Sequence, residues 1–224
     1  MVVAYIANKA LYDKLPTAVN SLLSNNQEVD KIYLLIEDDE IPYINSQKIK
    51  FINLSKRNDI VKSGINCTKR YPYTTMARCF LPSIIRENKI LYLDVDTTVN
   101  ASIKELWNVS LGANYAAARF ETEDYFNSGV LLMNLQLIKG CEKKLHDLLK
   151  NCKFAFPDQD AMNIVFKNRV AKLPDKYNVL GRSDVYKTHE IAIRHYAGLI
   201  KPWKDTAAKQ DIAFWNKYKC NAIN

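Results

Sequence analysis

Two aspartates that follow an apolar run are the residues best suited to chemistry in this sequence. The segment ILYLDVDTTV covers residues 90–99, and its two carboxylates are Asp94 and Asp96. In an extended chain, residues i and i+2 face the same side, so both carboxylates could meet one hard cation while Val95 points into the core. Oxygen ligands suit Mg²⁺ or Mn²⁺. The alternative interpretation of the pair is a solvated turn after a strand.

Two classes of enzyme use a pair of aspartates in such a position. One is a metal-dependent nucleotide-sugar transferase, in which the cation holds the diphosphate leaving group. The other is a phosphatase of the haloacid dehalogenase type, in which Asp94 would be the nucleophile and Asp96 a general acid/base. Such a phosphatase usually opens with this strand and carries a later acidic cluster such as GDxxxD. Here residues 1–89 precede the segment and no such cluster follows, which favours the transferase.

Four further segments accompany the aspartate pair in a recognisable order and spacing. Together with YLDVD, they closely resemble the glycosyltransferase family that contains glycogenin and the bacterial lipopolysaccharide galactosyltransferases. The resemblance covers most of the chain from about residue 70 to 203, and more weakly the N-terminal strand and helix. The four segments are YTTMARCFLP (73–82), YFNSGVLLMNL (125–135), PDQDAMN (157–163) and HYAGLIKPW (195–203).

The resemblance implies a GT-A fold, which is a single Rossmann-like α/β domain with a mainly parallel mixed sheet. We expect that domain to span residues 1–224. Its nucleotide-binding half would cover 1–100 and end in the aspartate pair, and its donor-sugar and acceptor half would cover 101–224. Members of the family use a UDP-sugar and a divalent cation, usually Mn²⁺. They transfer the sugar with retention of configuration, which gives an α-linkage.

Three residues match the metal ligands of the family, namely Asp94, Asp96 and His195. Imidazole with two carboxylates and diphosphate oxygens makes a plausible shell for Mn²⁺, with Mg²⁺ as the other candidate. Considered alone, His195 would be interpreted as a packed strand histidine. Lys201 matches the lysine that contacts the diphosphate, where it would supply positive charge as the bond to the leaving group breaks. Gly198 would let the backbone approach the phosphates closely.

Four residues match positions around the donor sugar. Arg78 matches an arginine that reaches the nucleotide and donor region, although Met76 replaces the aromatic residue usual two positions before it. Asn127 would lie beside the sugar, unless it only shapes a turn. Asp158 would bind sugar hydroxyls and Gln159 would lie near the anomeric carbon. A primary amide is a poor nucleophile, which favours same-face substitution assisted by the leaving phosphate over a covalent enzyme intermediate.

The nucleotide end departs most from the family pattern, which places a polar turn with an aromatic residue after the first strand. Here the turn runs from Ala7 to Tyr12. Asn8 fits a polar contact to the base. Tyr12 is the candidate for stacking on the uracil, although it is displaced and Leu11 could occupy the expected place. With Ala7 and Val95, these residues complete the predicted donor-binding set.

The elements that must position these residues follow from apolar runs and helical spacing. Continuous apolar strands that alternate with helices indicate an α/β architecture. Pro82 should distort or break the helix that contains it. We expect strands at 2–7, 31–36, 50–54, 89–93, 115–118, 129–132 and 190–196, and helices at 16–23, 74–86, 137–150 and 158–166.

Composition limits the remaining possibilities. The chain has 224 residues, a net charge of +8 and no apolar run of the ~18–20 residues that a membrane span requires. Its five cysteines are odd in number and lack CxxC spacing, which fits a reducing cytoplasm. No GxGxxG motif, P-loop or nucleic-acid-binding signature is present. The segment from Lys201 to Lys219 mixes lysines and aromatic residues. It could contact an anionic membrane peripherally, or it could be a helix that closes the domain.

These observations predict a cytoplasmic, Mn²⁺-dependent, retaining transferase that moves glucose or galactose from a UDP-sugar. The acceptor would be a glycan, a glycolipid or a protein-linked glycan of a polysaccharide pathway. The two alternatives are the phosphatase and a non-catalytic homologue that binds the UDP-sugar without turning it over.

Overall fold

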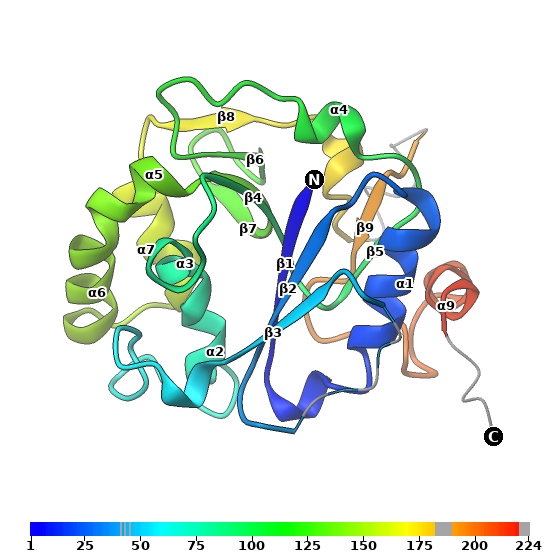
Figure 1. Ribbon diagram of the computed structural model, residues 1–224, viewed down its shortest axis with the longest axis horizontal. Helices are drawn as coiled ribbons and strands as arrows, with labels where there is room; N and C mark the ends of the chain where they lie inside the picture. The colour runs from blue at the N-terminus through cyan, green and yellow to red at the C-terminus, as the bar shows by residue number, and fades with distance from the viewer. Residues whose placement is uncertain (41, 43, 45, 182–189, 220–224) are drawn as a thin grey trace.

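A seven-stranded sheet forms the centre of the computed structural model, which describes residues 1–40, 42, 44, 46–181 and 190–219 (Figure 1). The strand order is β3-β2-β1-β4-β7-β6-β8, and β5 and β9 form a second, two-stranded sheet. The strands are β1 (Val2–Ala7), β2 (Lys31–Ile36), β3 (Ile49–Asn53), β4 (Lys89–Leu93), β5 (Thr97–Val99), β6 (Ala116–Phe120), β7 (Phe126–Asn134), β8 (Val170–Lys172) and β9 (Ile193–His195).

One strand of the large sheet, β7, runs in the opposite direction to both of its neighbours. Strands β3, β2, β1 and β4 run parallel to one another. Strand β7 runs antiparallel to β4, with Leu93 opposite Val130, and β6 in turn runs antiparallel to β7. The first residues of β7 therefore lie at the same sheet edge as the last residues of β1 and β4.

Short helices connect and cover the strands. The α-helices are α1 (Leu15–Asn25), α2 (Tyr73–Met76), α3 (Leu81–Ile84), α4 (Lys104–Trp107), α5 (Leu135–Ile138), α6 (Glu142–Asn151), α7 (Pro157–Val165) and α9 (Lys209–Lys217). The 3₁₀ helices are η1 (Lys9–Leu11), η2 (Leu54–Lys56), η3 (Ala77–Phe80), η4 (Lys139–Cys141) and η5 (Asp175–Tyr177).

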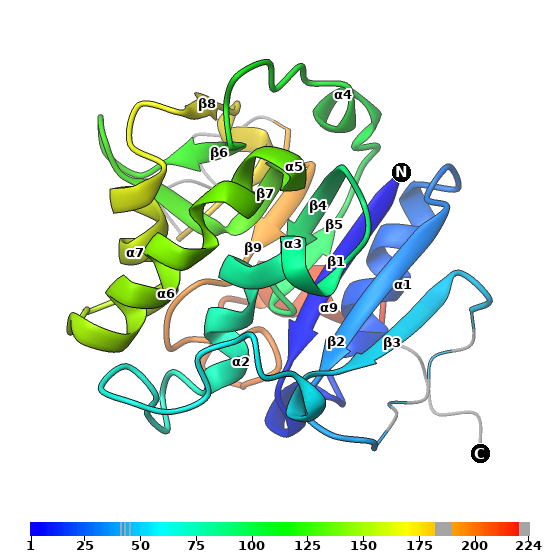
Figure 2. The ribbon, with the colours of Figure 1, turned by 60° about the vertical axis from the view of Figure 1, so that its left-hand side comes forward.

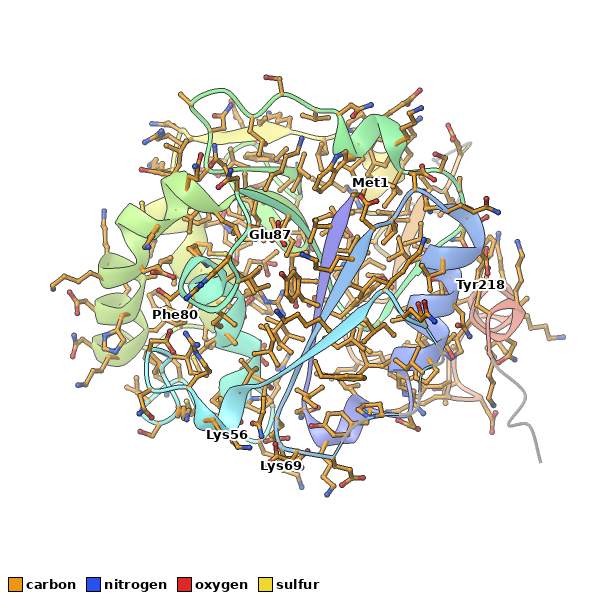
Figure 3. The ribbon with its side chains drawn as sticks, viewed as in Figure 1. Met1, Lys56, Lys69, Phe80, Glu87 and Tyr218 are labelled. Carbon is orange, nitrogen blue, oxygen red and sulfur yellow. The ribbon has the colours of Figure 1, made fainter. Side chains whose placement is uncertain are left out.

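Two apolar cores lie on the two faces of the sheet, because successive strand residues point to opposite sides. Along β1, Val3 and Tyr5 join the core under α1 and α4, whereas Ala4 and Ile6 join the core under α2, α3, α5, α6 and α7. Figure 2 shows the sheet between these two layers of helices. In Figure 3, Phe80 marks the side of α2, α3 and α6, and Tyr218 marks the side of α1 and α9.

The expected α/β architecture is confirmed, and three predicted strands, 2–7, 31–36 and 89–93, have the observed bounds. The helix predicted over 74–86 is interrupted, and the break expected from Pro82 is confirmed. The chain forms α2, then η3, then α3, because Pro82 in the first turn of α3 has no N–H to continue a regular helix. The strand predicted over 190–196 is shorter, since only Ile193–His195 pair with β5.

Two further predictions concern the surface and the thiols. Within the described part of the chain, no helix has the length and apolarity to cross a membrane. The four cysteines that the structure describes are free thiols, of which Cys79 is buried and Cys152 is exposed. Cys220 lies outside the described residues.

Candidate active site

The predicted site residues gather where β4 ends and β7 begins. Because the two strands are antiparallel, the chain after Leu93 lies against the start of β7, and the Asp94 N–H donates to the Gly129 carbonyl over 2.8 Å. Ligands of open α/β sheets bind at such carboxyl ends, near a change in strand direction. The topology thus brings the aspartate pair to the segment Asn127–Gly129.

Asp94, Asp96 and His195 form one cluster. Strand β5 pairs with β9 so that Thr97 lies opposite His195, and the Tyr196 N–H donates to the Asp96 carbonyl over 2.8 Å. His195 Nε2 is 3.6 Å from Asp94 Oδ2 and 3.5 Å from Asp96 Oδ1. One ligand atom from each residue lies within 4.8 Å of the others. Two carboxylates and an imidazole suit a divalent cation such as Mn²⁺, so these residues fit one.

The backbone reaches this arrangement by a turn, and the expectation of an extended segment is wrong. Residues 95 and 96 form a turn between β4 and β5. Val95 is only 2% exposed and packs in the core, as expected. The two carboxylates meet because the chain bends between them and β9 closes against β5.

Lys201 lies directly beside the cluster. Its Nζ donates to Asp96 Oδ2 and to the Tyr196 carbonyl, the latter over 2.8 Å. Burial of Asp96 opposes its ionisation, but the neighbouring His195 and Lys201 outweigh burial and hold the pKa of Asp96 well below its ordinary value. Asp96 is therefore an ionised carboxylate with one oxygen toward His195 and the other toward Lys201.

Arg78 is a buried cation between two carboxylates. It is 6% exposed, its Nη2 is 2.8 Å from Asp94 Oδ1, and its Nε is 3.2 Å from Asp158 Oδ2. Burial acts to lower the pKa of Arg78, but Asp158 and Asp94 outweigh it and raise that pKa. Burial also raises the pKa of Asp158, against the opposing charge of Arg78. Arg78 thus ties the first aspartate of the pair to the start of α7.

The segment 127–129 also meets the start of α7. The Ser128 N–H donates to Gln159 Oε1 over 2.9 Å, and Ser128 Oγ donates to Asp158 Oδ2 over 3.0 Å. Asn127 accepts a hydrogen bond from the Gly129 N–H and donates to Glu121 Oε1 over 2.7 Å. These bonds fix the amide side chains of Gln159 and Asn127. Ser128, Glu121 and Gly129 are site residues that the sequence reasoning missed.

Gly129 is required by space. A Cβ at this position would lie 2.1 Å from His195 Cε1 and 2.8 Å from Asp94 Oδ2. No side chain can stand so close to another without displacing it. A glycine inside a strand signals a close approach of this kind, and that was the available sequence signal.

Two adjoining hollows surround these residues. A cleft of about 460 Å³ is lined by residues of both predicted halves, including Asn127, Asp158, Gln159, His195, Gly198 and Lys201. A second hollow of about 300 Å³ lies beside it and is lined by Asn8, Leu11 and the basic residues Lys69 and Arg70. The two share Arg70, Thr75, Arg78, Asp94 and Asp96. Lys69, Arg70 and Thr75 had no sequence signal.

The predicted nucleotide residues divide between this hollow and the core. Asn8 lines the hollow, and its buried Oδ1 has no hydrogen-bond partner among the described residues. Tyr12 is 7% exposed, packs in the core and donates its hydroxyl to Asp38 Oδ1 over 2.9 Å. Burial raises the pKa of Tyr12 to about 12. The structure does not agree with stacking on Tyr12, because its ring is enclosed and Leu11 lines the hollow instead. Ala7 is also in the core.

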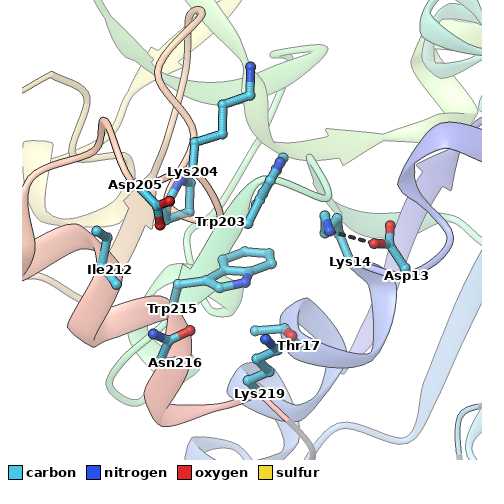
Figure 4. Close-up of a pocket in the computed structure, with 11 residues that line it drawn as sticks. Asp13, Lys14, Thr17, Trp203, Lys204, Asp205, Ile212, Trp215, Asn216 and Lys219 are labelled. Carbon is cyan, nitrogen blue, oxygen red and sulfur yellow. Dashed lines mark hydrogen bonds and ion pairs between the residues drawn. The ribbon is translucent and has the colours of Figure 1, made fainter.

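The C-terminal aromatic residues pack inward. Trp215 is 2% exposed, and its ring centroid is 4.9 Å from that of Trp203 and 5.9 Å from that of Tyr196. Figure 4 shows both indole rings at a cavity of about 440 Å³ between α1 and α9, with Lys14 on its other side. This packing agrees with α9 as a closing helix.

Comparisons with known proteins agree on one family. The model of glycosyl transferase family 8 matches residues 2–207. The chain is 30% identical over 246 residues to the glycosyltransferase GlyE of Streptococcus pneumoniae serotype 4, covering 96% of this chain and 60% of that protein. It is 25% identical to the lipopolysaccharide 1,2-glucosyltransferase of Escherichia coli K12, covering 95% of this chain and 75% of that one. The chain thus spans less than two thirds of the length of GlyE.

Solved structures agree on the fold. The crystal structure of GlyE superposes with a TM-score of 0.77 at 26% identity, covering 98% of this chain and 60% of that one. The galactosyltransferase LgtC in complex with donor and acceptor sugar analogues superposes with a TM-score of 0.74 at 21% identity, covering 99% and 97%. The expected GT-A fold is confirmed by these likenesses.

Proposed function

The chain belongs to glycosyl transferase family 8, and from this premise we propose that it moves glucose or galactose from a UDP-sugar to a glycan, glycolipid or protein-linked acceptor. The transfer retains configuration and gives an α-linkage. The observation that carries this proposal is the cluster of Asp94, Asp96 and His195, which lies at the edge shared by the two hollows.

In this proposal, Asp94, Asp96 and His195 hold Mn²⁺, with Mg²⁺ as the alternative. When bound, the cation neutralises charge on the diphosphate leaving group. Lys201 adds a second positive charge at the same place, because its ammonium group already contacts Asp96. Gly198 has φ +93°, a backbone conformation that favours glycine, and lines the cleft where its backbone can approach the phosphates.

The smaller hollow holds the nucleotide in this proposal. The unpartnered Oδ1 of Asn8 is a free acceptor for an N–H group of the base, because a buried acceptor without a partner costs free energy. Leu11 replaces Tyr12 as the proposed apolar contact to the base. Lys69 and Arg70 place positive charge on the path to the phosphates.

The donor sugar lies between α7 and the segment 127–129. Asp158 and Asn127 orient it, and Gln159 lies near the anomeric carbon. The Oε1 of Gln159 already accepts a hydrogen bond from the Ser128 N–H, so its lone pairs are less free to attack carbon. This contact supports same-face substitution, in which the leaving phosphate takes the proton of the acceptor hydroxyl. Membership of glycosyl transferase family 8 argues against the phosphatase alternative.

The test is UDP release from a panel of UDP-sugars, with Mn²⁺ or with EDTA. We expect slow release from one donor in the presence of Mn²⁺ and none with EDTA. Asp96→Ala should abolish it, whereas Asp59→Ala, at an exposed position outside the site, should leave it unchanged. Release that persists in Asp96→Ala contradicts the assigned cation site. Thermal stabilisation by UDP and Mn²⁺ without release from any donor favours the non-catalytic homologue.

A further inference from the structure

We propose that Asn178 is the positioning residue of the cation site and that it holds His195 in the one tautomer able to bind a cation. The inference rests on the proposed function, because it takes His195 as a cation ligand. Asn178 follows η5, is fully buried and bonds by its side chain to Asn127 and His195. Its side chain reaches the site through His195 and Asn127, and its effect on the cation passes through His195.

Three hydrogen bonds join four side chains in series. His195 Nδ1 is 2.9 Å from Asn178 Oδ1, and Asn178 Nδ2 is 2.9 Å from Asn127 Oδ1. Asn127 Nδ2 lies 2.7 Å from Glu121 Oε1. His195 is 3% exposed and Asn127 is 7% exposed, so the first two bonds are closed to solvent.

The direction of these bonds follows from the group at each end. The backbone N–H of Gly129 lies 2.9 Å from one amide atom of Asn127, and because an N–H can only donate, that atom is the oxygen. The same oxygen faces Asn178, which must therefore present its NH₂ group. The remaining amide atom of Asn178 is its oxygen, and it can only accept a proton from His195 Nδ1.

The Glu121 end of this hydrogen-bonded series requires the same order of donors and acceptors. Glu121 is a carboxylate and accepts, so Asn127 must present its NH₂ group there. Both ends thus assign the proton of His195 to Nδ1. Nε2 is then the ring nitrogen left to a cation, and it faces Asp94 and Asp96 at 3.6 Å and 3.5 Å. A histidine ligand needs such an unprotonated nitrogen, and a partner on its other nitrogen fixes the ring and the tautomer.

Backbone hydrogen bonds hold the residue after Asn178 against β9, independently of the Asn178 side chain. The His195 N–H donates to the Val179 carbonyl, and the Val179 N–H donates to the Ile193 carbonyl, each over 3.0 Å. A change of side chain at position 178 leaves these bonds in place. Loss of the amide should therefore affect His195 more than the path of β9.

The experiment is a direct titration with Mn²⁺ in the absence of any donor, with free Mn²⁺ measured by electron paramagnetic resonance. Asn178→Leu, which has the same number of side-chain heavy atoms but can make neither bond, should weaken Mn²⁺ binding about 10–100-fold. Asn178→Asp keeps an acceptor for the Nδ1 proton but loses the donor to Asn127, so it should recover a measurable part of the affinity that Asn178→Leu loses, since carboxylates serve as the partner of histidine ligands. Rescue by Asp but not by Leu separates positioning from space filling.

The matched control is Asn26→Leu, because Asn26 is equally buried and hydrogen-bonded but lies at the end of α1. It should lower the melting temperature without changing Mn²⁺ affinity. A test without any variant uses Zn²⁺ as a diamagnetic probe. Of the three histidines in the chain, the one whose resonances shift with Zn²⁺ should carry its proton on Nδ1 in ¹H–¹⁵N spectra.

The outcomes separate this inference from the proposed function. If the unaltered chain binds no Mn²⁺, both the cation site and the role of Asn178 are overturned. If it binds Mn²⁺ and Asn178→Leu binds as tightly, only the role of Asn178 is overturned. An Asn178→Asp variant that binds Mn²⁺ no more tightly than Asn178→Leu, or a Zn²⁺-bound histidine protonated on Nε2, also overturns it.

Discussion

Arg78 and Gly129 act on the site in opposite ways, one by its charge and the other by the space it leaves. Arg78 lies between the buried Asp158 and the partly buried Asp94, and without it these two carboxylates would repel each other. Gly129 has no side chain where the His195 ring and the Asp94 carboxylate must pass. Neither residue needs to touch the substrate for the cluster to depend on it.

The first prediction at this scale concerns Gly129. Gly129→Ala would place a Cβ 2.1 Å from His195 Cε1, so the ring must move and the cluster must open. We expect at least a tenfold loss of Mn²⁺ affinity, about the size of the effect of losing a partner of a metal ligand. Gly140→Ala is the control, because a Cβ there meets nothing within 4 Å. Equal affinities in the two variants would contradict the steric argument.

The second prediction concerns Arg78. Arg78→Met leaves Asp158 buried without its cation, and breaking one side of a buried ion pair costs about 3–5 kcal/mol in the free energy of unfolding. At about 2–4 °C for each kcal/mol, the melting temperature should fall clearly in a calorimetric scan. Arg86→Met, at an exposed position, should change stability by less than about 0.5 kcal/mol. A stable Arg78→Met variant would mean that Asp158 is neutral in the folded chain.

At the scale of elements, the site depends on two antiparallel pairings within a mainly parallel fold. The β4–β7 pairing brings Gly129 to Asp94, and the β5–β9 pairing brings His195 to Asp96. Helix α9 supports the second pairing from outside, because Trp215 packs edge-on against Tyr196, the residue that follows β9. The cleft is thus built on strands, and α9 packs behind the β5–β9 pairing without lining the cleft itself.

The prediction at this scale concerns the docking of α9. Trp215→Ala removes a side chain that is 2% exposed, and such truncations cost about 3–5 kcal/mol in the free energy of unfolding. Chemical denaturation of Trp215→Ala should show this loss. Gln210→Ala, at an exposed position of the same helix, should stay within about 0.5 kcal/mol of the original chain. If the two variants unfold alike, α9 does not close the domain.

At the scale of the whole molecule, the two hollows are lined by residues from the start, middle and end of the chain. Asn8 follows the first strand, Asp94 and Asp96 follow the fourth, and Lys201 precedes the last helix. A donor that fills both hollows would bind only when these segments are assembled. Ligand binding should therefore stabilise the whole fold.

The prediction at this scale is a shift in melting temperature with ligand. A ligand at 100 times its dissociation constant stabilises the folded state by about 2.7 kcal/mol, which corresponds to roughly 5–10 °C for a chain of this size. We expect such a shift with UDP and Mn²⁺ together. EDTA should remove most of it, and Asp96→Ala should show little of it. No shift with UDP and Mn²⁺ at saturating concentrations would contradict the assignment of the two hollows.

The sequence alone was sufficient for features that local patterns carry. Continuous apolar runs predicted β1, β2 and β4 with their observed bounds, because a strand buried on both faces carries its own signal. The order of five segments predicted the family and the GT-A fold, and both are confirmed. Asp94, Asp96 and His195 were named as one ligand set, and the structure brings them together.

Tertiary structure alone decided how those residues are held. Asn178 and Asn127 are 51 positions apart, and nothing in the local sequence of either one indicates that they share a hydrogen bond. In the sequence, Tyr12 was the candidate to stack on the base. In the fold, its hydroxyl bonds to Asp38 and its ring is buried, and Leu11 lines the smaller hollow instead. Strand propensity and motif spacing act over a few residues. Strand register and burial depend on segments that meet only after the chain has folded.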